Sequence, residues 1–297
     1  MRVVGLWAVL AALLAALTGP ADVPGGPAAS PGQVMDPGGP GRMTGPQDPA
    51  ADRRRADAVI REHPEIWTGA EVVGSGRALV VALPGGADPA DLARRADRAS
   101  AVVARLAGPV RPLVLAPATT AQAAVLAAPA DLTGLAAVAG AGRVTVEPVS
   151  FARLSPVGRD VVLAHELTHV ATGASADGRT PTWLVEGFAD YAGYLGAGVP
   201  VPAAAAELAA EVRAGRVPAA LPGREDFAAG APRAAQAYEE AWLACRYVAG
   251  RFGERALVTL YRESMRGDAG AALTRATGMG TAQFTAAWRA YVRTELS

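Results

Sequence analysis

The sequence predicts an α+β protein, in which a small mixed α/β lobe is followed by a mainly helical lobe. Short apolar runs that are typical of β-strands occur only in the first half of the chain. After Ser155, apolar residues recur at helical spacing, and Gly and Pro separate the segments. With 297 residues, the chain is long enough for one or two domains that bury a core.

The N-terminus has the pattern of an export signal. Arg2 precedes an apolar run at residues 3–17, which is shorter than the about 20 residues that span a membrane. Small residues follow, and Gly19-Pro20-Ala21 is a plausible cleavage site. We interpret residues 1–21 as a signal peptide, with a retained N-terminal membrane anchor as the alternative. The protein is therefore expected to be secreted or extracytoplasmic.

A Gly- and Pro-rich linker is predicted between the signal and the folded part. Residues 22–51 contain too little apolar surface to offset the entropy of ordering the chain. The α/β lobe is predicted over 52–150. Strands are expected at 77–83, 111–116 and 143–149. Helices are expected at 91–106 and 119–128. Because Pro148 lacks a backbone N–H, either the last strand lies at a sheet edge or Pro148 lies at the end of that strand.

The second lobe is predicted over 151–297 and is expected to be helical. Its expected helices are 156–172, 181–194, 202–214, 233–252, 254–266 and 281–295. The 28 basic and 28 acidic residues balance, which argues against a nucleic-acid partner. A single cysteine, Cys245, excludes an internal disulfide framework and zinc sites built from several thiolates.

Residues 165–169 carry the motif H-E-L-T-H, which is typical of a metal site on a helix. Ser155-Pro156 precedes it as an N-cap and a first-turn proline. His165 and His169 are four residues apart and share one helix face, so both imidazoles can reach one ion. Glu166 is turned about one residue round the helix, where it can act as general base on a metal-bound water.

A catalytic zinc site needs a third protein ligand and one open position. No further histidine follows the motif, and Cys245 lies far downstream among apolar residues. Glu186 and Asp190 share one face of the next predicted helix, four residues apart. Because their neighbours are apolar, unpaired acids there would be costly. One of the two acids can bind the metal while the other orients a ligand.

These residues resemble the gluzincin group of zinc metallopeptidases. The likeness rests on H-E-L-T-H followed by W-L-V-E-G-F-A-D-Y, and it is closest to small peptidase MA-like domains. It is strong over 155–195 and looser over 237–253, whereas 52–150 carries no motif that matches. The resemblance implies a zincin-like fold for the helical lobe, with the zinc site on the HExxH helix and the following helix.

The resemblance also implies a role for each site residue. It assigns one Zn²⁺ per chain to three ligands, which are His165, His169 and Glu186. It makes Glu166 the general base. It also implies that Asp190 supports one of the zinc-bound histidines. The oxyanion-stabilising histidine of thermolysin-like enzymes is missing, and Tyr238 is the candidate to replace it, as a tyrosine does in the aminopeptidases. The exopeptidase motif G-x-M-E-N is absent, so an aminopeptidase activity is not supported.

The leading hypothesis is an exported zinc metallopeptidase, an endopeptidase acting on a peptide or protein substrate. The alternative is a zinc-binding pseudo-peptidase that serves as an interaction domain; Glu166 argues against it, and the missing histidine argues for it. A third reading, a tethered structural domain, is opposed by the matched second helix. Membrane contact is expected only if the N-terminal segment is retained. A strand at 144–149 is expected at a sheet edge, where it could pair with an extended substrate.

Overall fold

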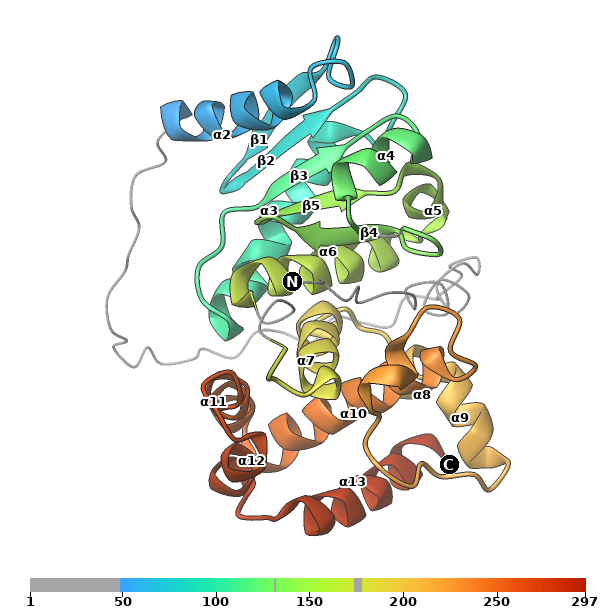
Figure 1. The fold of residues 1–297 in the computed structure, drawn as a ribbon. Coiled ribbons are helices and arrows are strands. Elements are labelled where there is room, and N and C mark those ends of the chain that lie inside the picture. The colour runs from blue at the N-terminus through green and yellow to red at the C-terminus, as the bar shows by residue number, and fades with distance from the viewer. Residues whose placement is uncertain (1–48, 131, 174–177) are drawn as a thin grey trace, which may run out of the picture.

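The computed structural model describes residues 49–130, 132–173 and 178–297 (Figure 1). The predicted signal peptide and most of the predicted linker lie outside these residues. The first described helix, α2 (Pro49–Glu62), takes in the last residues that the sequence assigned to the linker. None of the helices in the described part of the chain combines the length and apolarity that crossing a membrane requires.

The α/β lobe is built on one five-stranded sheet with the strand order β1-β2-β3-β5-β4. Its strands are β1 (Glu71–Ser75), β2 (Ala78–Ala82), β3 (Leu113–Ala116), β4 (Ala137–Gly140) and β5 (Arg143–Val146). The three central strands run parallel, and β1 and β4 are antiparallel edge strands. The mixed α/β character expected from the sequence is therefore confirmed.

The expectation that the strand near residue 144 lies at a sheet edge is wrong, whereas the alternative, Pro148 at the strand's end, agrees with the structure. β5 is an internal strand that pairs with β3 on one side and β4 on the other. The strand ends at Val146, and Pro148 begins the short helix α5 (Pro148–Arg153). The edge strand next to β5 is β4, which the sequence analysis missed because Ala137–Gly140 contains a single large apolar residue.

Side chains alternate between two cores on either side of the sheet, as the period of a strand requires. In β2, Val80 and Ala82 pack into the core under α3 (Pro89–Leu106) and α6 (Pro156–Thr172). Leu79 and Val81 pack on the other side, into the core that includes residues of α2. Figure 1 shows α6 lying between the sheet and the helical lobe.

The helical lobe forms a separate buried core. Its elements are α7 (Thr182–Tyr194), α8 (Val201–Ala204), α9 (Ala206–Arg213), a 3₁₀ turn at Arg224–Phe227, α10 (Ala234–Phe252), α11 (Glu254–Ser264), α12 (Ala269–Thr277) and α13 (Thr281–Leu296). Phe188, Tyr261 and Trp288 are among the large side chains buried in it. The helix predicted at 202–214 is divided into α8 and α9, because Ala205 leaves the helical conformation.

Candidate metal centre

Three side chains that could hold a metal ion converge where α6 meets α7. His165 Nε2 and His169 Nε2 lie 3.0 Å apart. Each of these atoms lies 3.5 Å from Glu186 Oε2. Atoms that coordinate a tetrahedral zinc ion at about 2.0–2.1 Å are about 3.3 Å from one another. The three donor atoms therefore already have the spacing that a single zinc ion requires, and all three residues are buried.

Local sequence places α6 and its two histidines. Ser155 caps the helix by accepting a hydrogen bond from the Gly158 N–H, and Pro156 occupies the first turn. Gly173 ends the helix in the left-handed conformation, with φ 63°. Between these caps, the i,i+4 spacing brings His165 and His169 onto the face that meets α7.

Two glycines let α7 approach its neighbours closely. A Cβ on Gly193 would lie 2.9 Å from the Val161 carbonyl oxygen of α6. A Cβ on Gly187 would lie 2.2 Å from the Ala241 carbonyl oxygen of α10. Real Cβ atoms are essentially never found at such distances from other heavy atoms. The small residues thus hold α7 between the two helices, with Glu186 and Asp190 in the buried interface.

Asp190 sets the orientation of His165. Asp190 Oδ1 lies 2.7 Å from His165 Nδ1, so the ring nitrogen donates to the carboxylate and the lone pair of Nε2 faces the site. In His169, Nδ1 is buried and has no hydrogen-bond partner among the described residues; the same holds for Glu186 Oε1. Asp190 is thus in direct contact with one of the two histidines of the cluster.

The electrostatics of the cluster fit a bound dication. Burial acts to lower the pKa of His165, but the carboxylates of Asp190 and Glu186 outweigh it and hold that pKa well above 6.5. For Glu186, burial acts to raise the pKa, but the histidines His169 and His165 lower it to about 2. With Glu166, three buried carboxylates face two imidazoles. A divalent cation would offset this excess of negative charge, which is costly to bury alone.

Glu166 lies beside the three donors and is held by the sheet. Its Oε2 accepts a hydrogen bond of 2.7 Å from the Ala139 N–H. In β4, Ala139 faces Val144 of β5 and Gly140 faces Arg143. Because hydrogen-bonded pairs alternate along a two-residue hairpin, the Ala139 N–H points away from β5. Sequence reasoning missed this contact, because the only signal was a short Ala- and Gly-rich run before the hairpin turn.

Tyr238 comes to the site from α10. The side chain is buried and packs edge-on against Phe227, with ring centroids 5.0 Å apart. Burial and the carboxylates of Glu186, Asp190 and Glu166 raise its pKa well above 10, so the phenol stays neutral and can donate a hydrogen bond. Tyr238 is thus within electrostatic reach of the cluster.

The chain resembles known structures only at low sequence identity. No protein-family model and no curated protein matches the chain. Two solved structures resemble it: a two-domain M1 zinc metallopeptidase mutant bound to L-arginine, and an M1 zinc metallopeptidase mutant from Deinococcus radiodurans bound to a Tyr-Ser-Ala substrate. They are 19% and 21% identical, with TM-scores of 0.41 and 0.40. Each match covers 77% of this chain and 51% of the other, so the chain spans about half their length. The chemistry of the site therefore rests on its own residues.

Proposed function

We propose that the chain is a zinc-dependent metallopeptidase that hydrolyses peptide bonds. One observation carries the proposal: three donor atoms from His165, His169 and Glu186 meet at zinc-ligand spacing, with a fourth side chain, Glu166, beside them but outside the triad. A structural zinc site is closed by four protein ligands, whereas a catalytic one keeps a position open and needs a base nearby. Three donors with a carboxylate beside them support a site of the second kind.

Each of the site residues has a proposed task. His165, His169 and Glu186 would hold one zinc ion, which when bound lowers the pKa of a water molecule toward about 7 and polarises a carbonyl group. Glu166 would accept the proton of the attacking water and pass it to the leaving amine. Asp190 would keep His165 in the tautomer whose Nε2 is free to bind.

Tyr238 is the proposed donor to the oxyanion. Because its pKa is raised, the phenol remains protonated at neutral pH and can donate to developing negative charge. A donor in a buried site is worth more than one in water, since little solvent competes with it. This role would replace that of the histidine that thermolysin-like enzymes use.

β4 is the proposed docking edge for the substrate. It is an edge strand, and the outward N–H of Ala139 lies next to Glu166. An extended peptide that pairs with this edge would place a backbone carbonyl near the general base. This replaces the expectation that residues 144–149 would form such an edge. An edge that accepts a peptide along its length suits an endopeptidase.

A pseudo-peptidase that binds zinc and serves as an interaction domain is the second candidate. The observation that favours it is the closed character of the site. His165, Glu166, His169 and Glu186 are all buried, and the Ala139 N–H occupies one oxygen of Glu166. A site closed in this way would admit no substrate.

Metal content is the measurement that tests the proposal first. The purified protein is expected to carry about one zinc ion per chain by mass spectrometry. Glu186→Ala should lose that zinc, whereas Glu225→Ala, which alters an exposed acid outside the cluster, should keep it. An absence of zinc from wild-type protein that retains its fold would remove the basis of the proposal.

Activity then separates the two candidates. Zinc-loaded protein should cleave members of a quenched fluorescent peptide library, and Glu166→Gln should not. A protein that binds zinc but cleaves no member of the library, nor casein, would favour the interaction domain.

The proposal includes export. N-terminal sequencing of the protein recovered outside the cells is expected to begin after residue 21. An intact Met1 in a soluble extracellular fraction would contradict the signal-peptide interpretation.

A further inference from the structure

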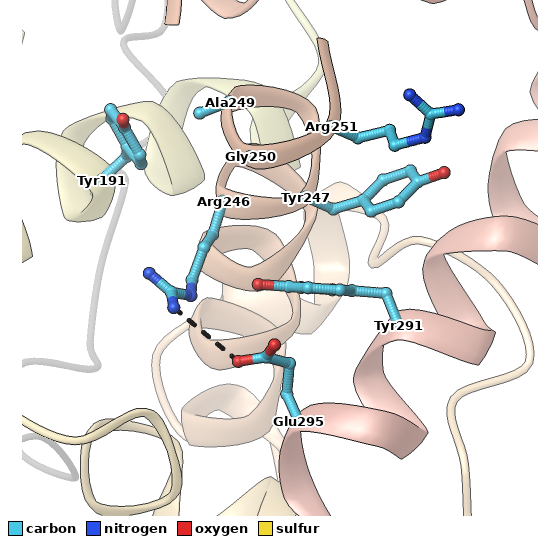
Figure 2. A pocket seen from close by; sticks show the side chains of 8 residues that line it. All are labelled: Tyr191, Arg246, Tyr247, Ala249, Gly250, Arg251, Tyr291 and Glu295. Atoms are coloured by element: carbon cyan, nitrogen blue, oxygen red, sulfur yellow. Dashed lines mark ion pairs between the residues drawn. The ribbon is translucent and has the colours of Figure 1, made fainter. Parts of the chain in front are cut away.

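A cavity lies on the side of α10 that faces α13. Its volume is about 470 Å³, and its lining comes from α7, α10 and α13 (Figure 2). This volume is within the range of small-molecule sites. The pocket contains none of the residues of the metal centre, although its Tyr191 directly follows Asp190 in α7. The pocket is therefore separate from the proposed peptidase site.

Gly250 lines this pocket and has no side chain to fill it. It lies inside α10, where glycine is less favourable than alanine. No heavy atom comes within 4 Å of the position that a Cβ would take, so close packing does not require a glycine there. Gly250 follows Arg246 by four residues and therefore lies on the same face of the helix, one turn further on. The missing side chain leaves space directly above Arg246.

The guanidinium group of Arg246 has five N–H donors, and its ion pair with Glu295 leaves some of them available. Its side chain is 42% exposed, and a guanidinium nitrogen lies 3.7 Å from Glu295 Oε2. A charge-assisted bond between such groups is about 2.7–2.9 Å long, so this ion pair is loose. Figure 2 shows the guanidinium group directed toward the Glu295 carboxylate, with the Tyr291 hydroxyl pointing to the same region. Another anion could therefore compete for Arg246 at little cost.

The pocket as a whole has an excess of positive charge. Arg251 also lines it and, in the described part of the chain, forms no ion pair; its guanidinium lies 5.6 Å from the ring centre of Phe252. Arg246 and Arg251 together carry two positive charges against the one negative charge of Glu295. A ligand with a single negative charge would neutralise the remainder.

The walls of the pocket are aromatic. The rings of Tyr247 and Tyr291 lie 5.3 Å apart at an angle of 42°. On the α7 side, Tyr191 presents its ring, while its hydroxyl donates to Glu254 Oε2 at 3.3 Å. Flat aromatic surfaces of this kind pack well against another ring or an apolar chain. They would take the body of a ligand whose charged end reaches Arg246.

We propose that this pocket binds a small carboxylate with an aromatic or apolar body, its carboxylate on Arg246 and its body against Tyr247 and Tyr291. Two sources share this chemistry, a free aromatic acid and the C-terminal residue of a peptide. Carboxylate is favoured over phosphate, because the planar guanidinium matches it and because one negative charge completes the balance.

Titration calorimetry on the full chain tests the charge requirement. The first probe is 3-phenylpropanoate, with the neutral 3-phenylpropanamide as its matched control. The acid is expected to bind, and the amide to bind about tenfold more weakly or worse. A tripeptide ending in phenylalanine, used as free acid and as C-terminal amide, shows whether peptides bind as well as free acids. Equal affinities for acid and amide, or no binding of any acid, would overturn the proposal.

Two substitutions should act in opposite directions. Arg246→Gln is expected to weaken binding of 3-phenylpropanoate about tenfold or more, since it removes the charged donor. Glu295→Gln is expected to tighten binding about two- to fivefold, because it frees Arg246 from a competing carboxylate. Arg266→Gln, a change of an exposed arginine outside the pocket, should leave affinity unchanged. A loss of affinity in both pocket variants would contradict the assignment.

Gly250 gives a test of the pocket's shape. Gly250→Leu should fill the space above Arg246 and abolish binding, and Gly250→Ala should weaken binding while raising the melting temperature. Circular dichroism checks that both variants fold. Full affinity in a folded Gly250→Leu would overturn the proposal. So would binding that survives every pocket variant but is lost in Glu186→Ala, because it would place the acid at the metal centre.

Discussion

Helices α7 and α10 bear two polar sites of opposite character. Where α7 meets α6, Glu186 and Asp190 are almost completely buried, and their partners lie 2.7–3.5 Å away. On the side of α10 toward α13, Arg246 and Glu295 are partly exposed and lie 3.7 Å apart. Helix α7 thus contributes to a closed cluster of closely spaced charges on one side and to an open, loosely paired pocket on the other.

Burial accounts for the difference. In the closed cluster little water screens the charges, so each carboxylate needs a positive partner and small displacements are costly. In the open pocket, solvent screens the charges and an ion pair contributes little. The buried cluster suits chemistry that needs fixed geometry, and the open pocket suits a ligand that exchanges. Changes in the first should therefore have much larger effects than changes in the second.

The largest effect is expected from Glu166→Gln. The amide keeps the size of the side chain but cannot accept a proton, so peptide hydrolysis should fall about 10²–10⁴-fold. Zinc content should stay the same, since Glu166 is not one of the three converging donors. The measurement is turnover of a cleaved library peptide with zinc content determined on the same sample. Activity within a few-fold of wild type would contradict the role of general base.

Substituting one glycine near each site compares how tightly the closed cluster and the open pocket are packed. Gly187→Ala places a Cβ 2.2 Å from the Ala241 carbonyl oxygen, so it should lower the free energy of unfolding by about 1–3 kcal/mol or more. Gly250→Ala meets empty space and should raise it by up to about 1 kcal/mol. Urea denaturation measures both. A loss of stability at Gly250 equal to that at Gly187 would mean that the open side is also tightly packed.

The comparison also explains which features could be predicted from the sequence. The helix over 156–172 and its neighbour near 181–194 are where the periodicity placed them, because strong caps and long apolar faces mark them. Helical spacing alone predicts that His165 and His169 share one face of the first helix and that Glu186 and Asp190 share one face of the second. The choice of Glu186 as the third donor came from the family resemblance, and the meeting of the two faces is a result of tertiary packing.

Features that depend on tertiary pairing could not be predicted in this way. The short strand β4 and the Ala139 N–H that meets Glu166 leave almost no sequence signal. Their role arises from the order of strands in the sheet, which the local pattern does not contain. The pocket beside α10 is another example, since α7, α10 and α13 come together only in the folded chain.

Glu239 is a buried carboxyl group for which no cationic partner is found in the described part of the chain, so its effect on stability should depend on pH. Burial and the nearby Glu207 raise its pKa to about 9, although its hydrogen bond from the Leu208 N–H acts the other way. In the unfolded chain the pKa is about 4.3. Between these values the folded state binds more protons, so stability is lost as pH rises from about 5 to 9.

Comparison with Glu239→Gln isolates this contribution, because glutamine can still accept from Leu208 but does not titrate. The stability of wild type relative to this variant should fall by more than about 1 kcal/mol over that range. Urea unfolding at several pH values measures the difference. A difference that rises with pH would mean that Glu239 is stabilised as a carboxylate.

Asp190→Asn tests how far charge, rather than hydrogen bonding, matters in the closed cluster. Asparagine can still accept from His165 Nδ1 but lacks the negative charge. We expect zinc affinity to fall about tenfold, the lower end of the range for partners of metal-bound histidines. Competition with a chromogenic chelator measures it. Unchanged affinity would mean that the hydrogen bond alone orients the ring.

The smallest effect is expected on the open side, from Glu295→Gln. Because Arg246 and Glu295 lie 3.7 Å apart and are partly exposed, losing the pair should lower the free energy of unfolding by about 0–1 kcal/mol. Salt should erase even this difference, since the Debye length is only about 3 Å at 1 M. Urea unfolding at low and high salt measures it. A larger loss that persists at 1 M salt would show that this ion pair behaves as a buried one, and the contrast between the two sides of α10 would no longer hold.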